Sequence, residues 1–178
     1  MGGVGGGVGA WRAGDEPAAQ QGIINVRLNV FPASRTPGAY NFSSITAAFK
    51  AYNMSSFVDV ENVIWHGRSA SSLVPGWEAT LRDIVTAASP HLASGAVAGL
   101  FLGDEIVCGG VPASNLSAVA AGAKRALRSA GHSSALVYVN ECKNSFLGAD
   151  GRPYIKGKIP AGLDIISFDS CPPHDHHH

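Results

Sequence analysis

Short runs of apolar residues alternate along the chain with longer stretches in which apolar residues recur every three or four positions. The short runs are rich in β-branched and aromatic residues, and several are bounded by Pro or Gly, which is typical of strands. A continuous apolar run of this length indicates a strand covered on both faces, as in a parallel sheet. The pattern predicts strands at residues 22–30, 57–65, 97–102, 135–139 and 163–168.

Three of the intervening stretches have the spacing of amphipathic helices. A serine precedes the first apolar stripe and can cap its helix, a Pro-Gly pair precedes the second, and a glycine follows the third. The pattern predicts helices from Ser43 or Ser44 to about Tyr52, from Trp77 to about Pro90, and over residues 112–130.

Strands and helices therefore alternate, and strand starts are about 40 residues apart, which is typical of repeated βα units. We expect an α/β fold, a partial (β/α)8 TIM barrel of about five parallel strands. The chain has 178 residues, whereas a complete barrel needs about 200 to 250. A flavodoxin-like, doubly wound sheet is the alternative, because such a domain fits this length.

These elements assign residues 22–171 to one partial barrel domain. Residues 1–21 begin with a Gly-rich, low-complexity segment and are expected to form a disordered leader. Residues 172–178 contain four histidines and are expected to form a disordered tail. The stretch from Cys142 to Gly162 is rich in Gly and Pro and has no helical period, so we expect a long loop that is functional or disordered.

Composition excludes several classes of protein. Apolar residues make up 46% of the chain and charged residues 15%, which is typical of a packed domain. Lys+Arg and Asp+Glu number 13 each, and no basic patch is visible, so we expect no nucleic-acid partner. No stretch reaches the roughly 18–20 apolar residues of a membrane span, so we expect no membrane partner. Gly5, Gly7 and Ala10 match a dinucleotide-binding fingerprint, but no strand precedes them, and we expect no cofactor.

The three cysteines each follow the end of a predicted strand, so they are expected to lie near one another. A disulfide between Cys108 and Cys142 would tie two loops together in an oxidising compartment. The spacing of these residues and Cys171 matches no zinc ribbon, so we expect no metal site. Three N-glycosylation sequons favour a secreted protein, although the chain has no signal-peptide pattern. The sequons begin at Asn41, Asn53 and Asn115.

Polar residues, most of them acidic, follow the ends of three predicted strands. In a parallel sheet the carboxyl ends of all strands lie at one edge, which is the active-site face of β/α barrels. We therefore expect these residues to share one site. For each position taken alone, the alternative is a carboxylate that caps the next helix. The residues are Asp104, Glu105, Asn140, Glu141 and Asp169.

Two further acids, Asp59 and Glu61, lie on one side of the predicted strand 57–65. If that side faces the interior, they need partners, and Arg27 on the preceding strand is a candidate. Contact with a substrate is the alternative. Trp65 ends the same strand and either offers its ring face to a sugar or packs in the core. Asp59, Glu61 and Trp65 are therefore candidate substrate-binding residues.

Carboxyl groups at one edge suit the cleavage of a glycosidic bond. One carboxyl, protonated because its pKa is raised, donates a proton to the leaving oxygen. The other attacks the sugar, activates water, or positions a substrate group that attacks. Glu105 is the candidate acid, and Glu141 or Asp169 is its candidate partner.

The segment GLFLGDEI, residues 99–106, resembles the strand-four motif of barrel glycoside hydrolases, and locally the Gly-Asp-Glu-Val segment of the β-hexosaminidases. In that family the Glu is the general acid, and the adjacent Asp orients the substrate 2-acetamido group, which acts as the internal nucleophile. The resemblance implies that Glu105 is the acid and Asp104 the orienting group. It also implies a carbohydrate substrate.

Two other segments resemble barrel glycosidases. VYVNEC, residues 137–142, is similar to their strand-terminal Asn-Glu pair. LDIISFDSC, residues 163–171, resembles the strand-six segment of chitinase-like barrels, which implies substrate-side roles for Phe168 and Asp169. Gly103 stands where chitinases carry an acid, so the common implication is the TIM-barrel glycoside hydrolase superfamily rather than one family.

The sequence therefore predicts a glycoside hydrolase-like domain that cleaves O-glycosidic bonds by carboxylate acid/base catalysis. Many barrel glycosidases carry their nucleophile on a later strand, so an incomplete and inactive barrel is included in this expectation. Alternatives are a non-catalytic carbohydrate-binding barrel, a flavodoxin-like domain that binds a small ligand at a switch point, and a metal-dependent hydrolase that uses the same acids.

Overall fold

A computed structural model describes residues 26–29, 40–66, 73–142 and 160–169, with only the backbone described for residues 26–29 and 169. The predicted leader, the predicted tail and residues 143–159 of the predicted long loop lie outside these ranges. Within them, strands and helices alternate as the sequence predicts. The elements are β1 (Val26–Asn29), α2 (Ser43–Tyr52), β2 (Ser55–Asp59), α3 (Glu61–Ile64), α4 (Trp77–Ala93), β3 (Val97–Asp104), α5 (Ala113–Ser129), β4 (Leu136–Cys142) and β5 (Ile165–Asp169).

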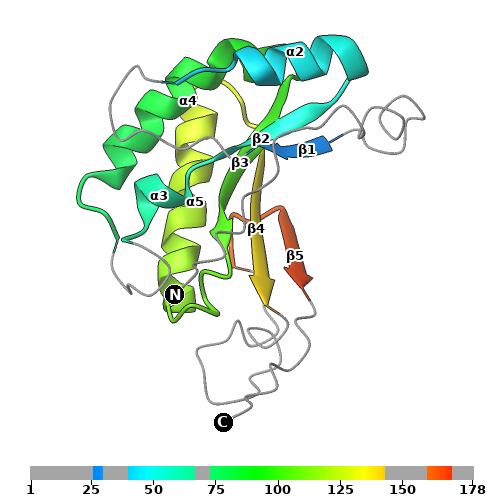
Figure 1. Ribbon diagram of the computed structural model, residues 1–178. Coiled ribbons are helices and arrows are strands. Elements are labelled where there is room, and N and C mark those ends of the chain that lie inside the picture. Colours follow the sequence, from blue (N-terminus) through cyan, green and yellow to red (C-terminus); the bar gives the residue numbers. More distant parts are fainter. Residues whose placement is uncertain (1–25, 30–39, 67–72, 143–159, 170–178) are drawn as a thin grey trace, which may run out of the picture.

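The described strands form one five-stranded sheet in the order β1-β2-β3-β4-β5. Every neighbouring pair is parallel (Figure 1). The order shows that each described strand lies beside the described strands that precede and follow it in the chain. The predicted α/β class and parallel direction are therefore confirmed. The carboxyl ends of the strands lie together at one end of the sheet, which we call the carboxyl edge; Asp59, Asp104, Cys142 and Asp169 end β2 to β5 there.

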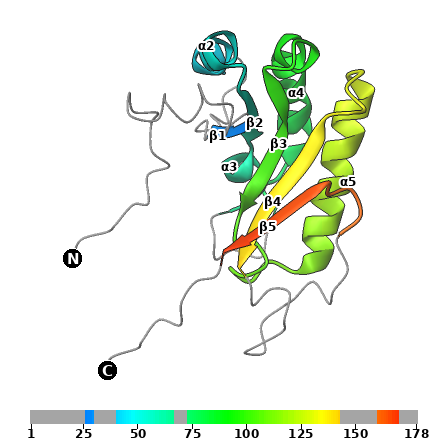
Figure 2. The ribbon, with the colours of Figure 1, turned by 90° about the vertical axis from the view of Figure 1, so that its right-hand side faces the viewer.

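Helices α4 and α5 lie on the same side of the sheet and contact each other, α4 against β3 and α5 against β4 (Figures 1 and 2). Right-handed crossovers produce this placement when successive strands are added in one direction. The core between sheet and helices is aliphatic, and burial of each Leu or Ile contributes about 1.5–3 kcal/mol. Its members on α4 and α5 include Leu81, Ile84, Val85 and Ala88 of α4 and Leu116, Val119, Ala120, Ala123 and Leu127 of α5.

The predicted strand 57–65 is wrong in its second half. β2 ends at Asp59, whose Oδ1 accepts the backbone N–H of Glu61 at 2.8 Å and so directs the chain into the short helix α3. This local bond overrides the apolar pattern of the segment. Helix α4 also continues beyond the predicted end, because Pro90 lies inside it and the last residue is Ala93.

Glycine is required where β3 and β4 approach each other. A Cβ atom added to Gly99 would overlap the backbone carbonyl of Leu136. Gly131, in contrast, follows α5 with φ +85° and has nothing within 4 Å of an added Cβ. The first glycine is thus required by packing, and the second by its left-handed backbone.

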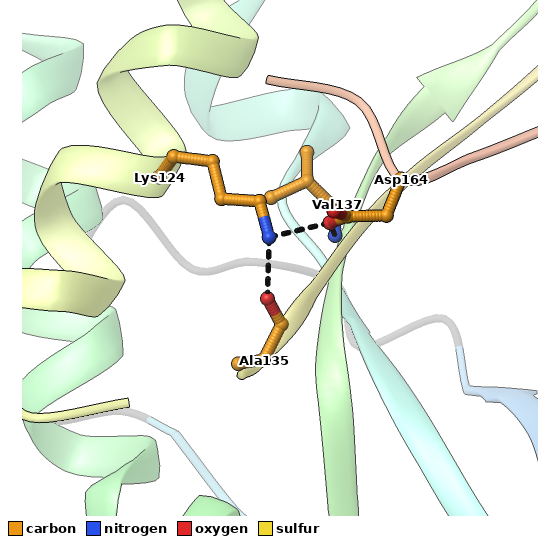
Figure 3. Close-up of polar contacts among 4 residues, drawn as sticks. All are labelled: Lys124, Ala135, Val137 and Asp164. Atoms are coloured by element: carbon orange, nitrogen blue, oxygen red, sulfur yellow. Dashed lines mark hydrogen bonds and ion pairs between the residues drawn. The ribbon is translucent and has the colours of Figure 1, made fainter. Parts of the chain in front are cut away.

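A polar clamp fastens α5 to the start of β4 and to the residue before β5 (Figure 3). The Lys124 ammonium of α5 lies 2.5 Å from Asp164 Oδ2 and donates to the Ala135 carbonyl at 2.8 Å. The same Asp164 oxygen accepts the Val137 N–H at 2.7 Å, and the Asp164 N–H donates to the Val137 carbonyl at 2.9 Å. This clamp, formed by Lys124, Ala135, Val137 and Asp164, sets the register of β5 on β4.

Candidate functional site

Polar side chains from three neighbouring strands meet at the carboxyl edge. Asn140 Nδ2 donates to Asp104 Oδ1 at 2.7 Å, linking β4 to β3. The Ser167 hydroxyl of β5 donates to Asn140 Oδ1 by a short hydrogen bond, and it lies 2.7 Å from the Tyr138 hydroxyl. Parallel registration makes this possible, because Asp104 pairs with Asn140 and Asn140 with Ser167. We call these four residues the edge network.

Two more carboxylates extend the edge network toward β2. Glu61 Oε2, from α3, accepts the backbone N–H of Asp104 at 3.2 Å. Asp59 is 4% exposed at the end of β2. Burial raises the pKa of the Asp59 carboxyl from 3.8 to about 6, and the negative charges of Glu61 and Asp104 also raise it, against the opposing hydrogen bond from the Glu61 N–H. Asp59 can therefore carry a proton in the weakly acidic range.

Glu105 lies in a sharp turn directly after β3. Its φ is +53°, a left-handed conformation that costs a non-glycine residue about 1–3 kcal/mol and is frequent at functional sites. Its N–H donates to the Asn140 carbonyl at 2.8 Å, and its own carbonyl accepts the Gly109 N–H at 2.7 Å. Gly103, with φ +141°, precedes the acid pair, and a Cβ there would press on the Ile106 and Glu61 side chains. The glycine thus leaves room for Glu61 beside Asp104.

Glu141, a predicted catalytic residue, is engaged elsewhere. Its side chain is fully buried, and its two oxygens accept the backbone N–H groups of Val107 at 2.8 Å and Cys108 at 3.2 Å. A disulfide joins Cys108 to Cys142, which confirms the predicted pairing. Glu141 and this disulfide together hold the turn that carries Glu105. The structure therefore gives Glu141 a supporting position and does not bring it into the edge network.

The remaining predicted substrate-binding residues are divided. Trp65 is 1% exposed and its indole N–H donates to the Leu102 carbonyl at 2.8 Å, so it takes the packing alternative. Phe168 of β5 is 60% exposed. Asp169 ends β5 in register with Cys142, and its side chain lies outside the described residues, as does that of Arg27. Phe168 thus remains accessible to a ligand, whereas Trp65 does not.

Sequence reasoning missed two members of the edge network, Tyr138 and Ser167. Tyr138 also contacts Phe57 and Phe101 with ring centroids 5.3 and 5.0 Å away, which forms an aromatic layer across β2, β3 and β4. The available signal was the period of two along β4 and β5, which places Tyr138 on the same strand face as Asn140, and Ser167 on the same face as Asp169.

Two absences apply to the residues that the structure describes. In that part of the chain, no three His, Cys, Asp or Glu side chains are placed to hold a metal ion together. The helices that the structure describes include none with the length and apolar character needed to cross a membrane. Comparison with family models, curated proteins and solved structures finds no match to this chain.

Proposed function

We propose that this chain is a glycoside hydrolase-like domain that cleaves O-glycosidic bonds at the carboxyl edge. The observation that supports this most directly is the convergence of Asp59, Glu61 and Asp104 on one hydrogen-bonded group with Asn140. Acid/base catalysis by paired carboxyls requires that one carboxyl is protonated while the other is ionised. The adjacent Glu105 adds a further carboxyl next to Asp104 in the chain.

A partial TIM barrel is the finer fold that we propose. Successive strand order without reversal supports it, since a flavodoxin-like sheet has the order 2-1-3-4-5 and a switch point between its halves. The placement of α4 and α5 on one side of the sheet also supports it, because a doubly wound sheet has helices on both faces. In a barrel, the carboxyl edge is the face that carries the active site.

In the proposed mechanism, Glu105 donates its proton to the glycosidic oxygen as the bond from that oxygen to the anomeric carbon breaks. Asp104, oriented by Asn140, positions the group that attacks the anomeric carbon. The Glu105 carboxylate then accepts a proton from the water that completes hydrolysis, which restores the acid. Glu61, which is half-buried, holds sugar hydroxyls, and the exposed ring of Phe168 offers an apolar face to the sugar. Asp59 is buried and binds the Glu61 N–H rather than the sugar.

A panel of aryl glycosides with fluorescent leaving groups tests this proposal. We expect turnover by the wild-type chain, and a loss of about 10²–10⁴-fold in kcat for Glu105→Gln, because the amide cannot donate the proton. Glu78→Gln is the matched control, since Glu78 is 59% exposed on α4 and pairs only with Arg125 among the contacts described for it. Equal turnover by wild type and Glu105→Gln would overturn the assignment.

A non-catalytic carbohydrate-binding domain is the second candidate. The engagement of both Glu141 oxygens by the backbone favours it, because that residue was the expected partner of the acid. Glycan binding that is measurable by calorimetry, without turnover of any glycoside in the panel, would establish this function instead.

A further inference from the structure

We infer that Ser167 is a positioning residue that anchors the Asn140 side-chain amide while its NH₂ group faces Asp104. The inference rests on the proposed function, because it assigns a role within the same site. Ser167 lies on β5 next to Phe168, which the proposed mechanism places against the sugar.

The direction of each hydrogen bond in the edge network is determined by its neighbours. A carboxylate only accepts, so Asp104 must accept a hydrogen bond from the Asn140 NH₂ group. The Asn140 oxygen then points to Ser167 and accepts a hydrogen bond from its hydroxyl, which has a single proton to donate. With its proton committed, Ser167 can only accept from the Tyr138 hydroxyl. The chain of donors therefore runs from Tyr138 through Ser167 and Asn140 to Asp104.

Reversal of the Asn140 amide would break this order at Asp104, whereas the Ser167 hydroxyl could accept from the NH₂ group instead of donating. The amide oxygen would then face the Asp104 carboxylate, acceptor against acceptor, unless Asp104 took up a proton. Asp104 thus selects which end of the amide faces it, and the Ser167 hydroxyl holds the other end in place. Loss of the hydroxyl should therefore release Asn140 and, through it, the orientation of Asp104.

The test uses the full chain and two isosteric variants, Ser167→Thr and Ser167→Val. Threonine keeps the hydroxyl and valine replaces it with a methyl group of similar shape, and both suit a strand. We expect kcat on the best aryl glycoside to fall about 10–100-fold in the valine variant, with KM changed less than threefold, and to stay within threefold in the threonine variant. Tyr138→Phe should lower kcat less than Ser167→Val, because it leaves the Ser167 donor in place.

A second measurement does not depend on turnover. The side-chain ¹⁵N–¹H₂ signals of Asn140 should move in Ser167→Val and stay close to wild type in Ser167→Thr. Ser167→Ala, which adds no bulk, must show the same displacement as valine. Equal Asn140 signals in the threonine and valine variants would overturn the positioning role. If the wild-type chain shows no turnover, the proposed function fails, and the Asn140 signals still decide this inference.

Discussion

Replacement of Asp164 tests whether the polar clamp holds β5 in place. The Asp164 carboxylate accepts from Lys124 and from the Val137 N–H, at 2.5 and 2.7 Å. Asp164→Ala removes both contacts, whereas Asp164→Asn retains an oxygen for the Val137 N–H and loses only the charge. The two variants therefore separate the ion pair from the backbone contact.

The expected loss of stability in each variant follows from the exposure of the contacting groups. Lys124 is 12% exposed and Asp164 33%, so solvent screening reduces the ion pair to about 1 kcal/mol. Val137 is fully buried, and an orphaned buried N–H costs about 1–3 kcal/mol. We expect Asp164→Asn to lower the free energy of unfolding by about 1 kcal/mol and Asp164→Ala by about 3 kcal/mol. For a chain of this size the larger loss corresponds to a fall in Tm of about 10 °C.

Urea denaturation followed by circular dichroism measures these differences, and thermal melting gives the matching Tm values. Glu78→Ala is the control, because its pair with Arg125 spans 3.3 Å with side chains 59% and 65% exposed, and such surface pairs contribute about 0–1 kcal/mol. The reasoning is refuted if Asp164→Ala unfolds within about 0.5 kcal/mol of wild type, or if Asn and Ala are equally destabilising.

Three further predictions concern stability. The folded chain binds the Asp59 proton more tightly than the unfolded chain, so stability falls as pH rises from about 4 to 6. Asp59→Asn should therefore raise the free energy of unfolding at pH 7 by about 2 kcal/mol but not at pH 4. The same difference between variant and wild type at every pH in urea titrations would contradict this. Gly99→Ala should cost more than about 3 kcal/mol because the added methyl overlaps the backbone of β4, whereas Gly131→Ala, with open space, should cost about 1 kcal/mol by chemical denaturation. Reduction of the Cys108–Cys142 disulfide, which spans 34 residues, should lower stability by about 2–4 kcal/mol in melts with and without dithiothreitol, and a loss below about 1 kcal/mol would show that the turn is held without it.

Much of the architecture could be predicted because it depends on local patterns. The apolar run at residues 97–102 and the stripe of α5 are each readable from spacing alone, and parallel pairing follows from their alternation. The end of β2 was missed because one hydrogen bond from the Glu61 N–H to Asp59 Oδ1 turns the chain within an apolar segment. Residue spacing does not encode a bond of that kind.

The candidate site was predictable at the level of strand ends and not at the level of side-chain direction. Asp104 and Asn140 meet because both terminate neighbouring parallel strands. Glu141 follows Asn140 directly, and alternation in a strand sends its side chain to the opposite face. Neither the buried backbone N–H groups that bind Glu141 nor the Lys124–Asp164 contact across 40 residues could be foreseen without the tertiary packing.

The unbroken strand order has a consequence for how the chain acquires its fold. Each strand pairs with the one synthesised just before it, so the sheet can be extended in the direction of translation without waiting for a distant partner. Loop closure then spans one strand-to-strand connection at a time, which keeps its entropic cost moderate at every step. β5 is added to a sheet that already contains the four described strands before it, and the Lys124 ammonium of α5 then pairs with the Asp164 carboxylate.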